Sequence, residues 1–184
     1  MVSDITELAL KHSVHYVGTH PMAGKEFSGF NYSDKDLFNG ANFIVTPIKD
    51  TDTNALNKVI KLAKEIGFGH IINTDPYEHD KIIAYTSQLA HIVSSAYVKS
   101  PTLEKEKGFT GGSFQDMTRI ATLNEDMWTS LFLLNKENLL FEIDTLIQNL
   151  KLYYDIISKN NSDKLRDLLR DGRILKEKNL QNTL

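Results

Sequence analysis

The sequence lacks cysteine and lacks a glycine-rich phosphate-binding turn, and these two absences exclude several kinds of site. Without cysteine there is no disulfide, no zinc–thiolate centre and no cysteine nucleophile. The ten glycines form no G-x-G-x-x-G and no G-x-x-x-x-G-K-[ST] pattern, and G-x-S-x-G is missing as well. The sequence therefore offers no recognisable loop for nucleotide phosphates.

Long apolar runs and charge of one sign are also scarce. The 184 residues carry a net charge of -3 and a sequence pI of about 6.1, so no basic field recruits nucleic acid or an anionic membrane. No apolar run approaches the roughly 18 residues of a membrane-spanning helix, and the acidic N-terminal stretch lacks the apolar core of a signal peptide. With 41% hydrophobic and 24% charged residues, we expect a globular, cytoplasmic protein without nucleic-acid or membrane partners.

The first part of the chain predicts a βαβ unit. Apolar runs at 42–46 and 69–73 indicate two strands. Between them, Asp52 or Thr53 can cap a helix that ends before Gly67. A strand, a helix and a strand in this order contain a parallel pair, so we predict the last part of a Rossmann-like domain.

Two further elements are predicted before this unit. Ser3 or Asp4 can cap a short helix that extends to about Lys11. Residues 14–19 indicate another strand, which ends before a proline.

After the βαβ unit the pattern is helical throughout. We predict a buried central helix over 77–99, a short helix after the glycine pair Gly111-Gly112, and one continuous helix from about 124 to 160. The long helix carries an apolar seam that needs a large partner surface, which favours a second copy of this chain. The seam contains Ile143, Leu146, Ile147, Leu150, Tyr153, Tyr154 and Ile157.

Together these patterns predict a mixed α/β fold that is predominantly helical. Residues 1–75 form the partial βαβ region, the back end of a Rossmann-like domain, and residues 76–184 form an all-α dimerisation domain. A charged helix capped by Asn161 or Ser162 completes the second part.

His20 is the first candidate for chemistry. It follows the predicted strand at 14–19 in the segment HPMAG, and ligands of open α/β sheets bind outside the carboxyl ends of strands. Imidazole has an ordinary pKa of about 6.5, which suits a general base near neutral pH. Gly24 permits close approach of the backbone to a ligand. A histidine that only caps a turn fits the same spacing.

Two helical pairs are further candidates. Ser87 and His91 are four residues apart, so they share one face of the predicted central helix, where polar groups need partners or a ligand. Asp116 and Arg119 are three residues apart, so the carboxylate can orient a guanidinium that binds carboxylates. A satisfied core pair and an ordinary surface ion pair remain the alternatives.

The remaining histidines are interpreted as turn or surface residues; they are His12, His15, His70 and His79. There is no H-E-x-x-H and no tight cluster of histidine and carboxylate residues in the sequence. No metal site is therefore predicted.

Four segments taken together resemble the prephenate/arogenate dehydrogenase family. HPMAGKEFSG, LFNGANFIVTP, EHDKIIAYTSQLAH and GGSFQDMTRIATLNEDMW occur in the order and spacing of that family. The match extends from about Val17 to Leu140, and the long helix fits as well. The resemblance implies the C-terminal portion of such an enzyme, without the G-x-G-x-x-G segment, and an active site between a dinucleotide-binding domain and a helical dimer domain.

The resemblance also implies roles for individual residues. His20 matches the catalytic histidine that draws off the proton of the substrate's ring hydroxyl, and Arg119 matches the arginine that binds a substrate carboxylate. Ser87 and His91 match polar residues of the substrate pocket. Residues that support or border the site are Glu26, Asp116 and Trp128.

The implied reaction is the NAD- or NADP-dependent oxidative decarboxylation of prephenate to 4-hydroxyphenylpyruvate in tyrosine biosynthesis, carried out by a homodimer. Arogenate dehydrogenase, and an inactive binding or dimerisation module of the same family, stay open as alternatives. The missing phosphate-binding turn favours inactivity of this polypeptide alone and leaves the cofactor-binding residues unknown. The family often has Ser-His-Leu-Pro-His where this chain has SQLAH at 87–91, which bears on the choice of substrate.

Overall fold

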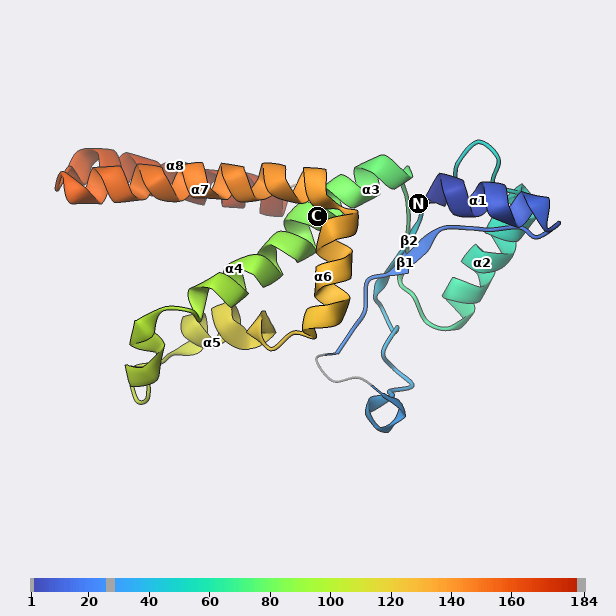
Figure 1. Ribbon diagram of the computed structural model, residues 1–184, viewed down its shortest axis with the longest axis horizontal. Helices are drawn as coiled ribbons and strands as arrows, with labels where there is room; N and C mark the ends of the chain where they lie inside the picture. The colour runs from blue at the N-terminus through green and yellow to red at the C-terminus, as the bar shows by residue number, and fades with distance from the viewer. Residues whose placement is uncertain (1, 26–28, 182–184) are drawn as a thin grey trace. The chain divides into compact units, whose positions relative to one another are not determined.

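The computed structural model describes residues 2–25 and 29–181 and contains two compact units that divide between Leu139 and Leu140. The first unit contains a three-stranded sheet and a set of helices, and the second consists of helices (Figure 1). Glu26, a predicted site residue, lies outside the described residues.

A small sheet forms the N-terminal part of the first unit. Strand β1 (Thr19–Pro21) pairs antiparallel with β2 (Asn42–Val45), and β2 pairs parallel with β3 (His70–Asn73). The order in the sheet is therefore β1-β2-β3. The strands predicted at 42–46 and 69–73 are confirmed to within one residue at an end.

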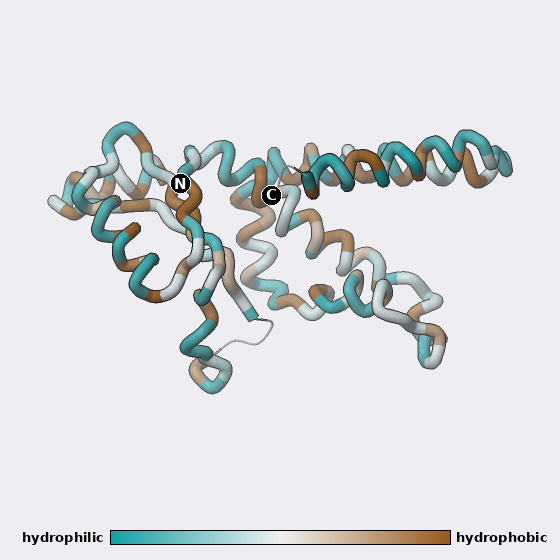
Figure 2. The backbone as a smooth tube through the Cα atoms, turned by 180° about the vertical axis from the view of Figure 1, so that it is seen from behind, coloured by the Kyte–Doolittle hydropathy of each residue, from teal (hydrophilic) through white to brown (hydrophobic). Residues whose placement is uncertain are grey.

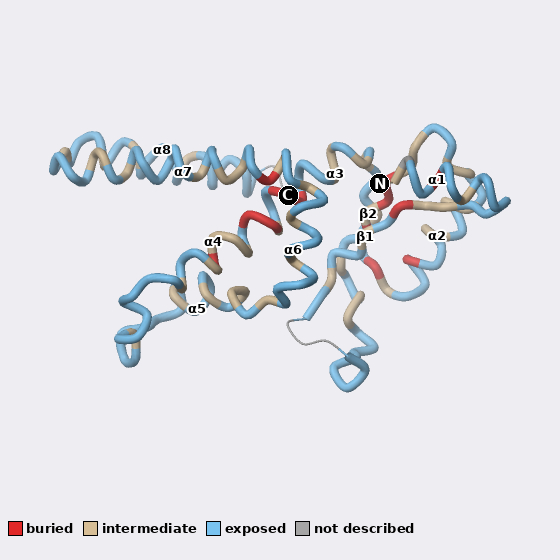
Figure 3. Tube along the Cα trace, in the orientation of Figure 1, coloured by how far each residue is buried: buried red, intermediate tan, exposed pale blue. Residues whose placement is uncertain are grey.

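Helix α2 (Thr53–Glu65) connects the two parallel strands and packs on the sheet. Asp52 accepts a hydrogen bond from the Ala55 N–H at 2.7 Å and so caps the helix start. Gly67 follows the helix with φ of 103°, a conformation that glycine adopts readily. Figure 3 shows buried segments on β2 and near the end of α2. The buried cluster contains Phe43, Val45, Ala63 and Phe68. The predicted βαβ unit is confirmed.

The first strand differs from the prediction. The sequence predicts a strand over 14–19, but β1 begins only at the last of these residues, because pairing with β2 starts where the Thr46 N–H donates to the Gly18 carbonyl. His20 therefore lies inside β1, opposite Ile44, and not beyond the end of its strand.

Helix α1 (Val2–Lys11) confirms the predicted N-terminal helix. It begins at Val2, so Asp4 lies in the first turn and is not the cap. The Thr6 hydroxyl donates to the Val2 carbonyl at 2.8 Å, which satisfies this buried side chain.

The helical part of the first unit begins with a helix that contains a π turn. Helix α3 (Pro76–Ile83) is capped by Asp75, whose carboxylate accepts hydrogen bonds from two backbone N–H groups. A π turn (Ala84–Gln88) follows, and α4 (Leu89–Tyr97) continues it. The helix predicted over 77–99 is present, but the sequence pattern did not reveal the π turn. The buried residues of α3, the π turn and α4 are Ile83, Ala84, Gln88, Leu89 and Ser94.

Short helices follow α4. Helix α5 (Gly112–Thr118) starts at the glycine pair, as predicted. Three short 3₁₀ helices in the described chain are Phe30–Tyr32, Pro101–Lys105 and Arg119–Ala121.

The continuous helix predicted after Asn124 is wrong in one respect, because Asn135 divides it. Helix α6 (Glu125–Leu134) ends there and α7 (Lys136–Ser158) begins just beyond. The Asn135 amide donates to the Asp80 carbonyl at 2.7 Å and to Gln88 Oε1 at 2.9 Å. These bonds to a distant helix accompany the break, and a local sequence pattern does not encode them.

The second unit contains most of α7 and helix α8 (Ser162–Gln181). Asn161 accepts from the Lys164 N–H at 3.1 Å and caps α8, so the predicted last helix is confirmed. From Leu140 onward no described residue is buried, and Figure 2 shows hydrophobic segments recurring along these helices. Exposed hydrophobic side chains include Phe141, Ile147, Leu150, Tyr154, Ile157 and Leu175.

In neither described stretch of the chain is any helix long and apolar enough to cross a membrane.

Candidate functional site

His20 faces a second histidine, which comes from the start of α3. His20 is half-buried, and its Nδ1 lies 2.9 Å from Nε2 of His79. The two rings meet edge to face, with centroids 5.2 Å apart and planes at 66°. The Nδ1 of His79 lies in turn 2.8 Å from Oδ1 of Asp80. The three side chains therefore form a continuous chain of hydrogen bonds.

The surroundings of His20 keep it neutral. Burial lowers the pKa of His20, and the neighbouring His79 lowers it further. At neutral pH the imidazole is therefore uncharged, which is the form that can accept a proton.

His79 was missed by the sequence reasoning, and its interpretation as a turn or surface residue is wrong. Its side chain is only 17% exposed. It follows β3 by six residues, at the sheet edge where β2 and β3 both end. That position was the available signal, since side chains beyond neighbouring parallel strands meet at one edge.

The π turn precedes His91, which stacks on an aromatic side chain of α6. The His91 Nδ1 donates to the Ser87 carbonyl at 2.9 Å, which fixes the ring against its own helix. The ring lies on Trp128 with centroids 3.8 Å apart and planes at 30°. Trp128 also contacts Phe132 at a centroid distance of 5.3 Å. Two flat rings thus form a rigid wall, and π turns often occur at functional sites.

A cavity of about 620 Å³ lies beside this stack, and we refer to it as the His91 cavity. Its lining includes Gly24, Lys25, His91, Arg119, Met127 and Trp128. Three predicted site residues thus meet at one cavity although they come from three separate helical segments.

The charged side chains in the described lining of the His91 cavity are both cationic. Arg119 stands at the start of the 3₁₀ turn after α5. Lys25 is a second cation on the lining, and it forms an ion pair with Asp34 at 2.8 Å. A flat aromatic wall beside two cations suits a planar, anionic ligand.

The other predicted residues lie around this cavity or apart from it. Ser87 is half-buried and contacts His91 through its carbonyl. Asp116 is exposed on α5. Neither of them, nor His20, is among the described residues that line the cavity.

Gln88 occupies the position where the resembled family often has a histidine. The side chain is buried, donates to the Leu131 carbonyl at 3.2 Å and accepts from Asn135 at 2.9 Å. It therefore contacts α6 and the junction with α7. Gln88 is not part of the described lining of the His91 cavity.

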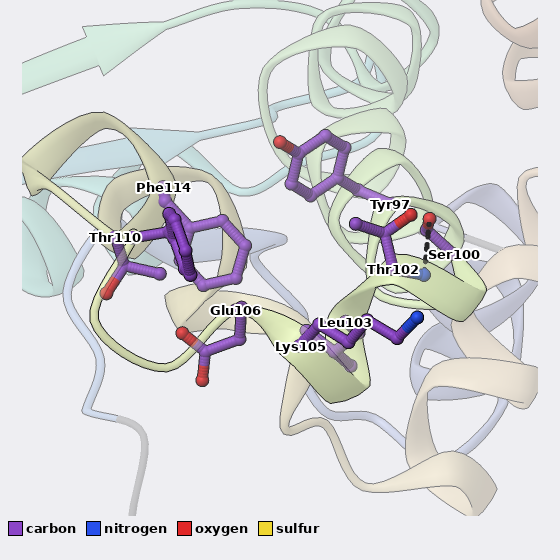
Figure 4. Close-up of a pocket in the computed structure, with 9 residues that line it drawn as sticks. Tyr97, Ser100, Thr102, Leu103, Lys105, Glu106, Thr110 and Phe114 are labelled. Carbon is purple, nitrogen blue, oxygen red and sulfur yellow. Dashed lines mark hydrogen bonds between the residues drawn. The ribbon is translucent and has the colours of Figure 1, made fainter.

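A second cavity, of about 790 Å³, lies between the end of α4 and the start of α5 (Figure 4). Tyr97 and Phe114 stand on its two sides, and the Thr102 N–H donates to Ser100 Oγ at 3.2 Å in its wall. Its described lining contains no histidine, no arginine and no predicted site residue. The His91 cavity is therefore the candidate site.

Comparison with known proteins identifies the family of the chain. The sequence model of the prephenate dehydrogenase nucleotide-binding domain matches residues 2–72, and that of the prephenate dehydrogenase dimerization domain matches residues 75–171. Prephenate dehydrogenase of Bacillus subtilis (strain 168) is 30% identical over 96% of this chain and 50% of that protein. Cyclohexadienyl dehydrogenase of Zymomonas mobilis is 28% identical over 85% of this chain and 55% of that protein.

Solved structures give the same result. Prephenate dehydrogenase from A. aeolicus, in complex with hydroxyphenyl propionate and NAD+, superimposes with a TM-score of 0.81 and 32% identity. The match covers 96% of this chain and 62% of that one. The chain spans about half the length of the curated relatives it matches. Since the two family models together match nearly the whole sequence, the chain belongs to the prephenate dehydrogenase family.

Proposed function

We propose that this chain provides the substrate-binding and dimer-forming part of an NAD(P)-dependent prephenate dehydrogenase, which converts prephenate to 4-hydroxyphenylpyruvate. The observation that carries the proposal is the meeting of His91, Trp128 and Arg119 at one cavity. Stacked flat rings suit the six-membered ring of the substrate, and a guanidinium suits one of its carboxylates. The A. aeolicus relative was solved with an aromatic acid of this class.

His20 is the proposed general base. Its lowered pKa keeps the ring neutral, so it can draw off the proton of the substrate's ring hydroxyl. Loss of that proton raises electron density on the carbon that is oxidised. Arg119 holds the substrate by a carboxylate and the His91–Trp128 wall orients the ring, so that the hydroxyl is presented to the base.

The residues present do not fit the pyrophosphate of a dinucleotide. None of the glycines within residues 2–72 belongs to a G-x-G-x-x-G turn, which normally cradles that group. We therefore assign the residues of the His91 cavity to the substrate, and NAD or NADP enters the proposal as the cofactor of the whole family enzyme.

A second copy of this chain is the proposed partner. Exposed apolar side chains recur along α7 and α8, and in water such a surface favours association. The matched dimerization-domain model includes all of α7 and the first half of α8.

Binding of a substrate analogue tests the site directly. Titration calorimetry with 4-hydroxyphenylpropionate is expected to give affinity that falls roughly 10- to 100-fold in Arg119→Ala, the loss of one charge-assisted interaction. Arg170→Ala, at an exposed arginine of α8, is the matched control and should bind as the wild type. Equal affinity of Arg119→Ala and wild type would refute the proposed site.

Turnover tests the reaction. Prephenate and arogenate are each offered with NAD+ and with NADP+, and reduced cofactor is followed by its near-ultraviolet absorbance. Activity with prephenate that is lost in His20→Ala supports the proposal, and a preference for arogenate would select the alternative dehydrogenase. Analogue binding without any turnover would assign this chain to the inactive binding module.

A further inference from the structure

We propose that His79 and Asp80 are a positioning pair that fixes the tautomer of His20, so that Nε2 of His20 carries the free lone pair. That this lone pair accepts the proton of the substrate's ring hydroxyl rests on the proposed function. The tautomer itself does not, because it follows from the hydrogen-bond chain.

The direction of the chain follows from its carboxylate end. An ionised carboxylate has no hydrogen to give, so Asp80 accepts at 2.8 Å and Nδ1 of His79 carries the hydrogen. Neutral His79 then has its lone pair on Nε2, which accepts the hydrogen of His20 Nδ1 at 2.9 Å. In neutral His20 the remaining nitrogen, Nε2, is left without a hydrogen and can act as a base.

The fold holds the backbone at both ends of this hydrogen-bond chain, and the Asp80 carboxylate itself is 58% exposed. The Asp80 carbonyl accepts from the Asn135 amide at 2.7 Å, which ties the first turns of α3 to the break between α6 and α7. His20 is held in β1 by pairing with Ile44. Because the His79 side chain is only 17% exposed, water competes weakly for the central bond.

The opposite arrangement makes the proposal testable. If Nε2 of His79 carried the hydrogen, it would donate to Nδ1 of His20. His20 would then carry its own hydrogen on Nε2 and could not accept a proton there. The negative charge of Asp80 favours the arrangement in which Nδ1 of His79 carries the hydrogen.

Long-range ¹H–¹⁵N correlation spectra of the ¹⁵N-labelled 184-residue chain distinguish the two tautomers, because protonated and bare ring nitrogens differ in chemical shift. Near neutral pH we expect His20 to show a protonated Nδ1 and a bare Nε2. The spectrum of His20→Gln assigns its signals, and the exposed His12 and His15 serve as internal references. A protonated Nε2 on His20 in the wild type would overturn the proposal.

Variants separate positioning from simple packing. In Asp80→Asn the amide can donate to His79, so the single His20 tautomer should be lost, and His79→Ala should lose it too. His79→Gln places an acceptor oxygen near the position of the imidazole Nε2 and should keep the Nδ1-protonated form. An unchanged His20 tautomer in both Asp80→Asn and His79→Ala, with folding verified by circular dichroism, refutes the positioning role.

Kinetics add a second readout where turnover is present. Asp80→Asn is expected to lower kcat by about 10- to 100-fold and to change KM by less than about threefold, since it acts on the base and not on substrate binding. An unchanged kcat would overturn the positioning role. Absence of any turnover in the wild type bears on the proposed function alone, and the NMR comparison still decides the tautomer.

Discussion

His91 and Trp128 stack face to face with ring centroids 3.8 Å apart, and this pair joins the helix after the π turn to α6. Neither residue is fully buried, so one side of the pair remains open to the His91 cavity. The stack therefore contributes to helix packing and to ligand binding at the same time.

Replacement of the tryptophan should separate these two contributions. Trp128→Leu removes the aromatic wall, and we expect analogue affinity to fall by about five- to tenfold, since an aromatic contact contributes about 1 kcal/mol. Trp128→Phe keeps a ring and should lose less. Calorimetry on both variants measures this, and equal affinities for wild type and Trp128→Leu would contradict it.

The lowered pKa of His20 gives the stability of the fold a pH dependence. Below pH 6.5, the ordinary value, the unfolded chain binds a proton at this residue more readily than the folded chain does. The contribution of His20 to stability is therefore complete above pH 6.5 and decreases as pH falls through the window down to the lowered pKa. Urea unfolding of wild type and His20→Gln at a series of pH values measures the difference, which should shrink toward acid pH. If the difference in the free energy of unfolding between wild type and His20→Gln grows toward acid pH, the pKa of His20 is not lowered in the folded chain.

Replacement of Asn135 is expected to lower the stability of the fold, although this residue lies at a helix end. Asn135→Ala removes the donor to Gln88, whose side chain is only 6% exposed, and a buried acceptor without a partner costs about 1–3 kcal/mol. We expect a lower urea midpoint, and Gln88→Leu in the same background should recover part of it. Asn149→Ala, at an exposed position of α7, is the control and should change the midpoint little. Equal effects of the two alanine variants would contradict this account.

Association through α7 is open to a charge test. Leu150→Glu places a carboxylate on an apolar, 58% exposed position, and we expect the chain to dissociate because burying an unpaired charge is costly. Asn149→Glu introduces the same charge at the neighbouring polar position and should leave association unchanged. Sedimentation equilibrium measures both, and a monomeric wild type would refute the proposed partner.

The βαβ unit was predictable because its signals are local. The cap at Asp52, the left-handed glycine at position 67 and the apolar runs of β2 and β3 act within a few residues of each other. The stretch at 14–19 carries a similar apolar pattern, but its strand depends on where β2 offers partners, so its position was misjudged.

The misses in the helical part depend on contacts between distant residues. Asn135 follows the end of α6 and donates hydrogen bonds to α3 and to the π turn. The residues next to it in the sequence carry no signal for these bonds. His79 was interpreted as a turn or surface residue, whereas its side chain contacts His20, which lies 59 residues away in the sequence. The grouping of His91, Arg119 and Trp128 came from the family resemblance, and their spacing alone left the alternatives open.

The π turn sets the rotational phase between two histidines of one helix. His79 and His91 are twelve positions apart, and at about 100° per residue an uninterrupted α-helix would place them about 120° apart in azimuth. A π turn accommodates one additional residue, here with the Leu89 N–H donating to the Ala84 carbonyl. The rotation about the helix axis from His79 to His91 therefore equals that of eleven α-helical residues. Eleven steps leave only about 20° between the two directions. The extra residue thus places His79, which supports the base His20, and His91, which lines the cavity, on one side of the helix. Deletion of one residue within 84–88 would make these two side chains point in different directions.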